Sequence, residues 1–183
     1  MLDLSKNYFE LFGMPVGYVI DIQKVQKRYR DLQRVVHPDR YVNATEQEQR
    51  LALQGAAYIN EAFETLKDPL RRAQYLLTLH DVDFDPETET TTDTGFLMEQ
   101  LELREELSEI PRQAEPLEAA TRFMERVSTM FNRLISSIAI DFEMPDAKQL
   151  EEAREKVRKM QFLKKLHAEA EAAEARLEEE AML

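Results

Sequence analysis

The residues best suited to chemistry in this sequence are His37 and Asp39, in the tripeptide His37-Pro38-Asp39. An imidazole beside a carboxylate can act as a base oriented by an acid, so a small hydrolase is one interpretation. The surroundings disfavour it, because an exposed turn offers no nucleophile, oxyanion hole or pocket, and the chain has no phosphate-cradling glycine loop. A metal site is disfavoured because His37 has no second histidine nearby. We expect no catalytic residue, metal or cofactor; the turn is either a protein-binding site or an ordinary turn with a polar tip.

An amphipathic helix is predicted before this turn, with Asp21 as its N-cap and Pro38 as its stop. Its apolar positions recur at helical spacing, at Val25, Tyr29, Leu32 and Val36. A basic row occupies a different face and leads to His37; it consists of Lys27, Arg30 and Arg34. The apolar positions are expected to face the core. The basic row is expected to meet an acidic partner, unless it serves only solubility.

A second helix is predicted after the turn, because Thr45 and Glu48 form a capping box. Its core positions are Ala52, Ala56, Ile59, Phe63 and Leu66. Short helices are expected at residues 7–12 and 70–79. Residues 1–79 therefore form an antiparallel helical hairpin with two flanking short helices, and the tripeptide lies at its tip.

The rest of the chain indicates a second all-α domain. Residues 80–93 are polar and acidic and are interpreted as an interdomain loop. Three longer helices are expected beyond it, at about 94–110, from 116 and from 146. Short connections between long amphipathic helices predict a three-helix bundle over residues 94–183.

The amino-acid composition excludes several classes of function. The formal net charge is -12, which argues against nucleic acid as the main partner, and the absence of Cys excludes disulfides and Cys-ligated zinc. Residues 1–40 nevertheless carry seven Lys or Arg against five Asp or Glu, so the basic row stands out in an acidic chain. No apolar run approaches the ~20 residues that span a bilayer, and no targeting segment is apparent, so a cytoplasmic protein without a membrane partner is expected.

A surplus of apolar residues marks the helix expected at 94–110. At about 100° per residue, one stripe suffices to pack a bundle: Phe96, Leu103, Leu107 and Ile110. Three more apolar residues lie well away from it: Leu97, Met98 and Leu101. Phe162 on the last helix likewise points away from the row Val157, Met160 and Leu163. These surplus residues are either sandwiched between neighbouring helices or exposed as a protein-binding patch, with Glu102, Arg104 and Glu105 at its rim.

The N-terminal segment resembles a J domain, the module by which DnaJ-class co-chaperones stimulate DnaK-class ATPases. The matching residues cover nearly all of the segment: Tyr8–Gly13, Tyr29–Leu32, His37–Arg40, Ile59–Leu66, Asp68-Pro69 and Arg72–Tyr75. The resemblance implies that the tip and the basic row bind the ATP-bound chaperone. Val35 departs from the Lys that many members carry at that position, so which basic residues dominate docking stays open.

The whole chain resembles the HscB family of iron–sulfur cluster biogenesis. The C-terminal resemblance rests on Phe96–Leu107 and Arg158–Leu166. It implies a co-chaperone, not an enzyme, that binds the ATPase HscA and delivers the cluster scaffold IscU to it. The scaffold contacts implied by position are Leu97, Met98, Leu101 and Phe162, with Glu102, Arg104 and Glu105 at the rim. A J protein with another client and a purely structural helical adaptor remain the alternatives.

Overall fold

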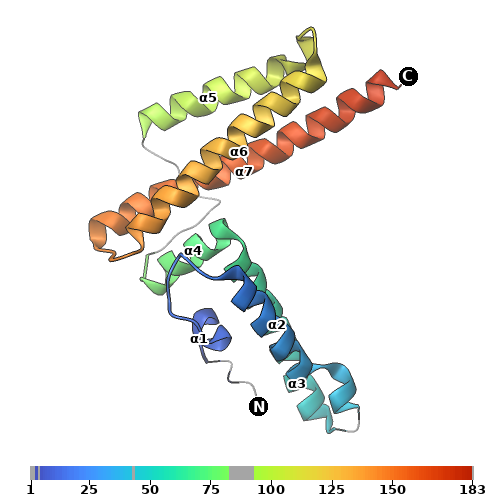
Figure 1. The fold of residues 1–183 in the computed structure, drawn as a ribbon, viewed down its shortest axis with the longest axis vertical. Helices are drawn as coiled ribbons and strands as arrows, with labels where there is room; N and C mark the ends of the chain where they lie inside the picture. The colour runs from blue at the N-terminus through green and yellow to red at the C-terminus, as the bar shows by residue number, and fades with distance from the viewer. Residues whose placement is uncertain (1–2, 4, 43, 83–92, 183) are drawn as a thin grey trace. The chain divides into compact units, whose positions relative to one another are not determined.

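The computed structural model of this 183-residue chain describes residues 3, 5–42, 44–82 and 93–182. In these residues the regular structure is entirely helical (Figure 1), which confirms the predicted all-α fold. The chain divides into two compact units, Met1–Leu79 (unit 1) and His80–Leu183 (unit 2). Most of the predicted interdomain loop, residues 83–92, lies outside the described residues.

Unit 1 is built on a hairpin of two helices, α2 (Ile22–Val36) and α3 (Glu46–Lys67), which lie side by side in Figure 1. Asp21 caps α2 as predicted, because its carboxylate accepts hydrogen bonds from the backbone N–H groups of Gln23 and Lys24. The predicted capping box of Thr45 and Glu48 opens α3. Both caps are fixed by local sequence, so the two long arms start where the sequence indicates.

The tip of the hairpin is more regular than the loop expected there. Residues Pro38–Tyr41 form a single 3-10 turn, η1. Proline at its first position presets the backbone φ angle, and the Arg40 N–H closes the turn on the His37 carbonyl at 3.0 Å. The turn therefore gives the tripeptide a defined backbone.

The base of the hairpin is closed by α1 (Tyr8–Phe12) and α4 (Pro69–Leu79). The Tyr8 ring stacks on Tyr75 with a centroid distance of 4.3 Å, and the Tyr8 N–H donates to the Tyr75 hydroxyl at 3.0 Å. The buried Arg72 donates to the Leu66 carbonyl at 2.5 Å and lies 4.9 Å from the Tyr18 ring centroid. Burial raises the pKa of Tyr18 to about 12. These contacts anchor the arms at the end opposite the tip.

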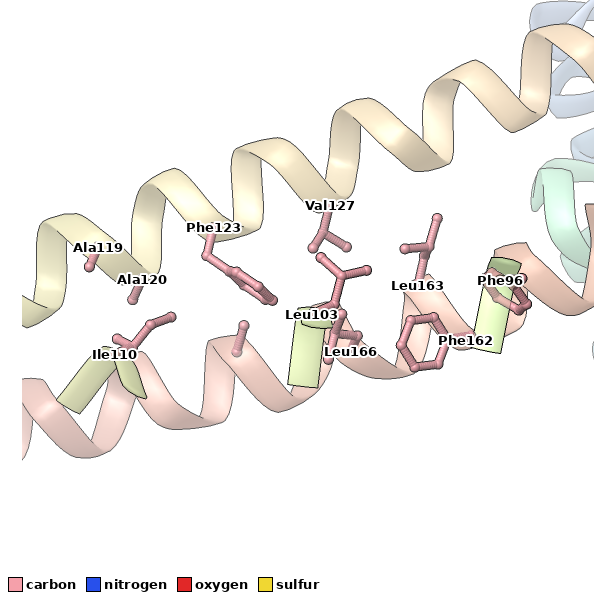
Figure 2. Close-up of a cluster of buried hydrophobic side chains, with 11 residues drawn as sticks. Phe96, Leu103, Ile110, Ala119, Ala120, Phe123, Val127, Phe162, Leu163 and Leu166 are labelled. Carbon is pink, nitrogen blue, oxygen red and sulfur yellow. The ribbon is translucent and has the colours of Figure 1, made fainter. Parts of the chain in front are cut away.

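Unit 2 contains α5 (Thr94–Glu109), η2 (Ile110–Arg112), α6 (Pro116–Asp141) and α7 (Ala147–Ala181). Helices α6 and α7 run alongside each other for much of their length, and α5 packs on α7, which confirms the predicted three-helix bundle. Figure 2 shows their shared core, where α5 supplies Phe96 and Leu103, and Ile110 follows in η2. These three residues are spaced by seven, so α5 meets the bundle along one narrow stripe.

Candidate protein-interaction sites

The tip exposes the two side chains that the sequence singles out. The His37 side chain is 57% exposed and that of Asp39 86%. Their closest polar atoms, Nδ1 of His37 and Oδ2 of Asp39, are 3.5 Å apart, and the same Nδ1 accepts the Asp39 N–H at 3.3 Å. Pro38 begins η1 between them. The arrangement presents an imidazole and a carboxylate to an incoming protein surface.

Three side chains that sequence reasoning did not single out as positioning residues tie η1 to the two arms. The Arg40 guanidinium donates to the Arg34 carbonyl at 3.2 Å, and the Tyr41 hydroxyl donates to the Val35 carbonyl at 3.3 Å. From α3, the Gln49 side-chain amide donates to the Tyr41 carbonyl at 3.1 Å. The Arg40 and Tyr41 bonds satisfy carbonyls in the last turn of α2, which a helix end otherwise leaves unpaired. The tip is thus held by its neighbours as well as by its own turn.

The basic row is exposed along α2, on the side away from the buried residues Val25 and Leu32. Arg34 contacts Asp31 one turn back, with its Nη1 3.4 Å from Oδ1. Within the described part of the chain, Lys27 and Arg30 form no ion pair. Two of the three predicted cations are therefore available to an acidic partner.

The hairpin arms are aligned by a polar and aromatic cluster below the tip. The Asn60 side-chain oxygen on α3 accepts from the Tyr29 hydroxyl at 2.9 Å and from the Gln33 amide at 2.5 Å, both on α2. The Tyr29 ring also stacks on Phe63 at 4.1 Å. Since these contacts fix α2 against α3, they set where the basic row and the tip lie on unit 1.

An exposed apolar patch lies on α5 and consists of Leu97, Met98 and Leu101. Their exposed fractions are 43%, 60% and 69%, so they are not sandwiched between helices. The predicted rim residues Glu102, Arg104 and Glu105 are exposed on the same helix. Three neighbouring large apolar side chains with a charged rim are typical of a protein-binding surface.

Phe162 is covered, one of the two positions that the sequence leaves open for it. The residue is 9% exposed and belongs to the core cluster. In Figure 2 its ring lies near Phe96; the two meet edge to face, with centroids 5.7 Å apart. Phe162 does point away from the main row of α7, as expected, but α5 covers it there. The ring therefore supports α5 from within.

Arg104 is held in place at the rim of the patch. Its guanidinium lies 5.6 Å from the Phe162 ring centroid and 3.6 Å from the carboxylate of Glu169 on α7. A second interhelical pair joins Glu106 on α5 to Arg126 on α6, and a third joins Asp93 to Lys159 at 2.9 Å. The hydrogen bond from Lys159 keeps the pKa of Asp93 below its usual value. These pairs could not be found from the sequence, because their members lie 20 to 66 residues apart.

No group of metal-ligating side chains occurs in the residues that the structure describes. Across the same ranges, none of the helices combines the length and hydropathy needed to cross a membrane.

Comparisons with known proteins agree with both units. Residues 7–75 match the DnaJ domain, and residues 92–171 match the HSCB C-terminal oligomerisation domain. A "Co-chaperone protein HscB homolog" from Vibrio atlanticus (strain LGP32) is 43% identical over 93% of this chain and 98% of its own length. A protein of the same description from Shewanella amazonensis (strain ATCC BAA-1098 / SB2B) is 41% identical over 92% of this chain and 97% of its own.

A solved structure is similar to this chain over nearly its whole length. The chain is similar to the chaperone HscB from Vibrio cholerae, with a TM-score of 0.83, 38% identity, and coverage of 94% of this chain and 99% of the other. Both units and nearly the whole length are thus shared with these relatives. The chain belongs to the HscB family of J-domain co-chaperones, which act in iron–sulfur cluster assembly.

Proposed function

We propose that this protein stimulates the DnaK-class ATPase HscA through unit 1 and delivers the scaffold protein IscU to it through unit 2. In this proposal residues 1–79 form the ATPase-binding domain and residues 94–183 the scaffold-binding domain, joined by residues 80–93. The observation that carries the proposal is the presence of two exposed surfaces of different chemistry in a chain of this family: a charged tip on one unit and an apolar patch on the other.

The chaperone-binding residues are proposed to be His37, Pro38 and Asp39 at the tip, together with Lys27, Arg30 and Arg34. The exposure of His37, Asp39 and the three cations supports this assignment, as does the anchoring of η1 by Arg40 and Tyr41. A surface that is already ordered loses little conformational entropy when it binds. Exposed cations also speed the encounter with an acidic surface.

The scaffold-binding residues are proposed to be Leu97, Met98 and Leu101, with Glu102, Arg104 and Glu105 at the rim and Phe162 beneath them. Burying three large apolar side chains that are exposed in the free protein supplies binding energy from the hydrophobic effect. The charged rim provides specificity, since a wrong partner would leave those charges unpaired.

The protein acts on its partner's reaction without supplying a catalytic group. To accelerate hydrolysis it must bind the hydrolysis-competent state of the chaperone more tightly than the resting state, because only differential affinity shifts such an equilibrium. We propose that the protein acts in the cytoplasm and has no enzymatic activity of its own; its similarity to proteins named as co-chaperones supports the second of these proposals.

The decisive experiment is the steady-state ATPase rate of HscA with this protein, with IscU and with both. We expect the combination to exceed the sum of the separate stimulations, because one protein binds both partners. No stimulation by this protein alone would contradict the assignment of the tip. Purely additive rates would contradict delivery of the scaffold, and the isolated protein should hydrolyse no ATP.

A further inference from the structure

A groove lies in unit 2 beyond the apolar patch, between the end of α5 with η2 and the last turns of α7. Its apolar lining consists of Leu107, Pro111, Ala172, Ala173 and Leu177. Upstream, large side chains of α7 such as Phe162 and Leu166 fill the core beneath α5. Alanines replace them after Glu169, so the space between the helices stays open. We call this feature the distal groove.

The edges of the distal groove are acidic. Glu169 and Glu180 line it, and the one cation in its lining, Arg176, has its Nε bonded to the Ala172 carbonyl on its own helix at 3.0 Å. Residues 168–183 together carry six Glu and one Arg. A segment that enters this groove must therefore bring positive charge as well as apolar surface.

The groove continues from the patch. Leu97, Leu101, Arg104 and Ser108 follow one another at intervals of four, three and four, so they lie along one face of α5. Ser108 is in the lining of the groove, and Glu169 both lines it and pairs with Arg104 at the rim of the patch. One partner could therefore cover both features without a break.

We propose that the scaffold protein, bound at the patch, also places an apolar segment carrying Lys or Arg in the distal groove. The inference rests on the proposed function and deepens it by naming a second contact for the same partner. A second copy of this chain is a poorer occupant through this face, because a two-fold contact would set acidic edge against acidic edge.

The test uses the full chain with a substitution that fills the groove. Ala173→Trp places a large ring in the lining, whereas Ala175→Trp puts the same ring at an exposed position of α7 outside it. Calorimetric titration with IscU should give an affinity about tenfold weaker for Ala173→Trp and within about twofold of wild type for Ala175→Trp. Equal affinities for the two variants would overturn the inference.

Two charge-reversal variants provide a second test, and neither changes the helix packing. Glu180→Lys alters the groove, while Glu178→Lys makes the same change on an exposed residue outside its lining. We expect about threefold weaker scaffold binding for the first, and a smaller loss for the second. Equal losses of affinity in the two variants would mean that the net charge of the helix weakens binding, and would refute a specific contact in the groove.

Two further outcomes separate this inference from the proposed function. If removing Leu97, Met98 and Leu101 also leaves IscU binding unchanged, the proposed scaffold site itself is wrong. If the wild-type protein forms a dimer in sedimentation experiments that Ala173→Trp dissociates, the occupant is a second copy and the inference fails. Thermal unfolding of each variant establishes that the bundle is intact.

Discussion

The two units present their surfaces in opposite ways. In unit 1 the tip presents His37 and Asp39, and the basic row presents its cations apart from the buried residues of α2, while hydrogen bonds from Arg40 and Tyr41 hold the tip. In unit 2 the patch consists of the same residue types as the core and shares α5 with Phe96 and Leu103. In the first unit, surface and core residues differ in charge. In the second unit they are of the same types and differ only in how many helices pack around them.

This difference predicts how mutations divide between folding and binding. The tip residues His37 and Asp39 can be replaced with little effect on stability, because their side chains are mostly exposed. Apolar residues of unit 2 can affect either property, and their exposed fraction decides which. The following variants test that division, beginning with the largest expected effect.

Replacing His37 by Gln should reduce HscA stimulation to the unstimulated rate. The side chain is exposed, so the free energy of unfolding should change by less than about 0.5 kcal/mol. His80→Gln alters another exposed histidine, outside unit 1, and should stimulate normally. Full stimulation by the His37 variant would show that the tip is not the activating element.

Phe162→Ala should destabilise the protein by about 3 kcal/mol, because it removes a buried ring that packs against Phe96. Leu101→Ala, on the exposed face of α5, should cost less than about 0.5 kcal/mol. Urea unfolding measures both. Similar values for the two would remove the distinction between core and patch in unit 2.

Joint replacement of Leu97, Met98 and Leu101 by Ala should weaken IscU binding about 30-fold, equivalent to about 2 kcal/mol. Stimulation of HscA by this protein alone should persist, while the added effect of the scaffold is lost. Ile140→Ala with Met144→Ala is the matched control, since both residues are exposed elsewhere in unit 2. Unchanged scaffold affinity in the triple variant would place the binding surface elsewhere.

Tyr41→Phe should cost about 1 kcal/mol of stability by removing the hydrogen bond to the Val35 carbonyl. Because that bond holds the tip, stimulation should fall several-fold while the basic row is intact. Tyr58→Phe removes a comparable bond to the Lys6 carbonyl at the base of unit 1 and should not lower stimulation. If both variants stimulate equally, ordering of the tip has no part in activation.

The smallest effect concerns Asp93 at the start of α5. Its folded-state pKa lies below the unfolded value of about 3.9, chiefly because of the bond from Lys159. The carboxylate therefore contributes stability at higher pH, and this contribution is lost as pH falls below about 4 through the folded pKa. Asp93→Asn should be slightly less stable than wild type at pH 7, and the difference should shrink as pH falls below about 4 in urea unfolding. A constant difference across this range would exclude the ionic contribution.

Most of the fold prediction rests on residues that act on their near neighbours in the sequence. Asp21, Thr45 and Pro38 determine helix ends by short-range chemistry, so the hairpin could be located from sequence. Long-range contacts could not be located that way. Nothing in the spacing of Asn60 reveals that it binds Tyr29 and Gln33 on the other arm.

Phe162 shows the limit for the functional surface. Helical periodicity gives the direction in which a side chain points but not whether another helix lies there. Periodicity gives the direction of Phe162 correctly but leaves it either covered or exposed, and α5, which packs on that side, covers it. Periodicity likewise leaves Leu97, Met98 and Leu101 either covered or exposed, and in the structure they are exposed.

The spacing of the α5 anchors has an evolutionary consequence. Phe96, Leu103 and Ile110 join the helix and its following turn to the bundle, with one buried residue in each interval of seven. Exposed positions between them that make no pair with another helix, such as Leu97, Met98 and Leu101, carry little folding constraint, so substitutions there can accumulate without loss of the native state. A lineage could therefore retune which protein it recognises through α5 while inheriting an unchanged bundle, and this face should diverge fastest wherever the partner itself diverges.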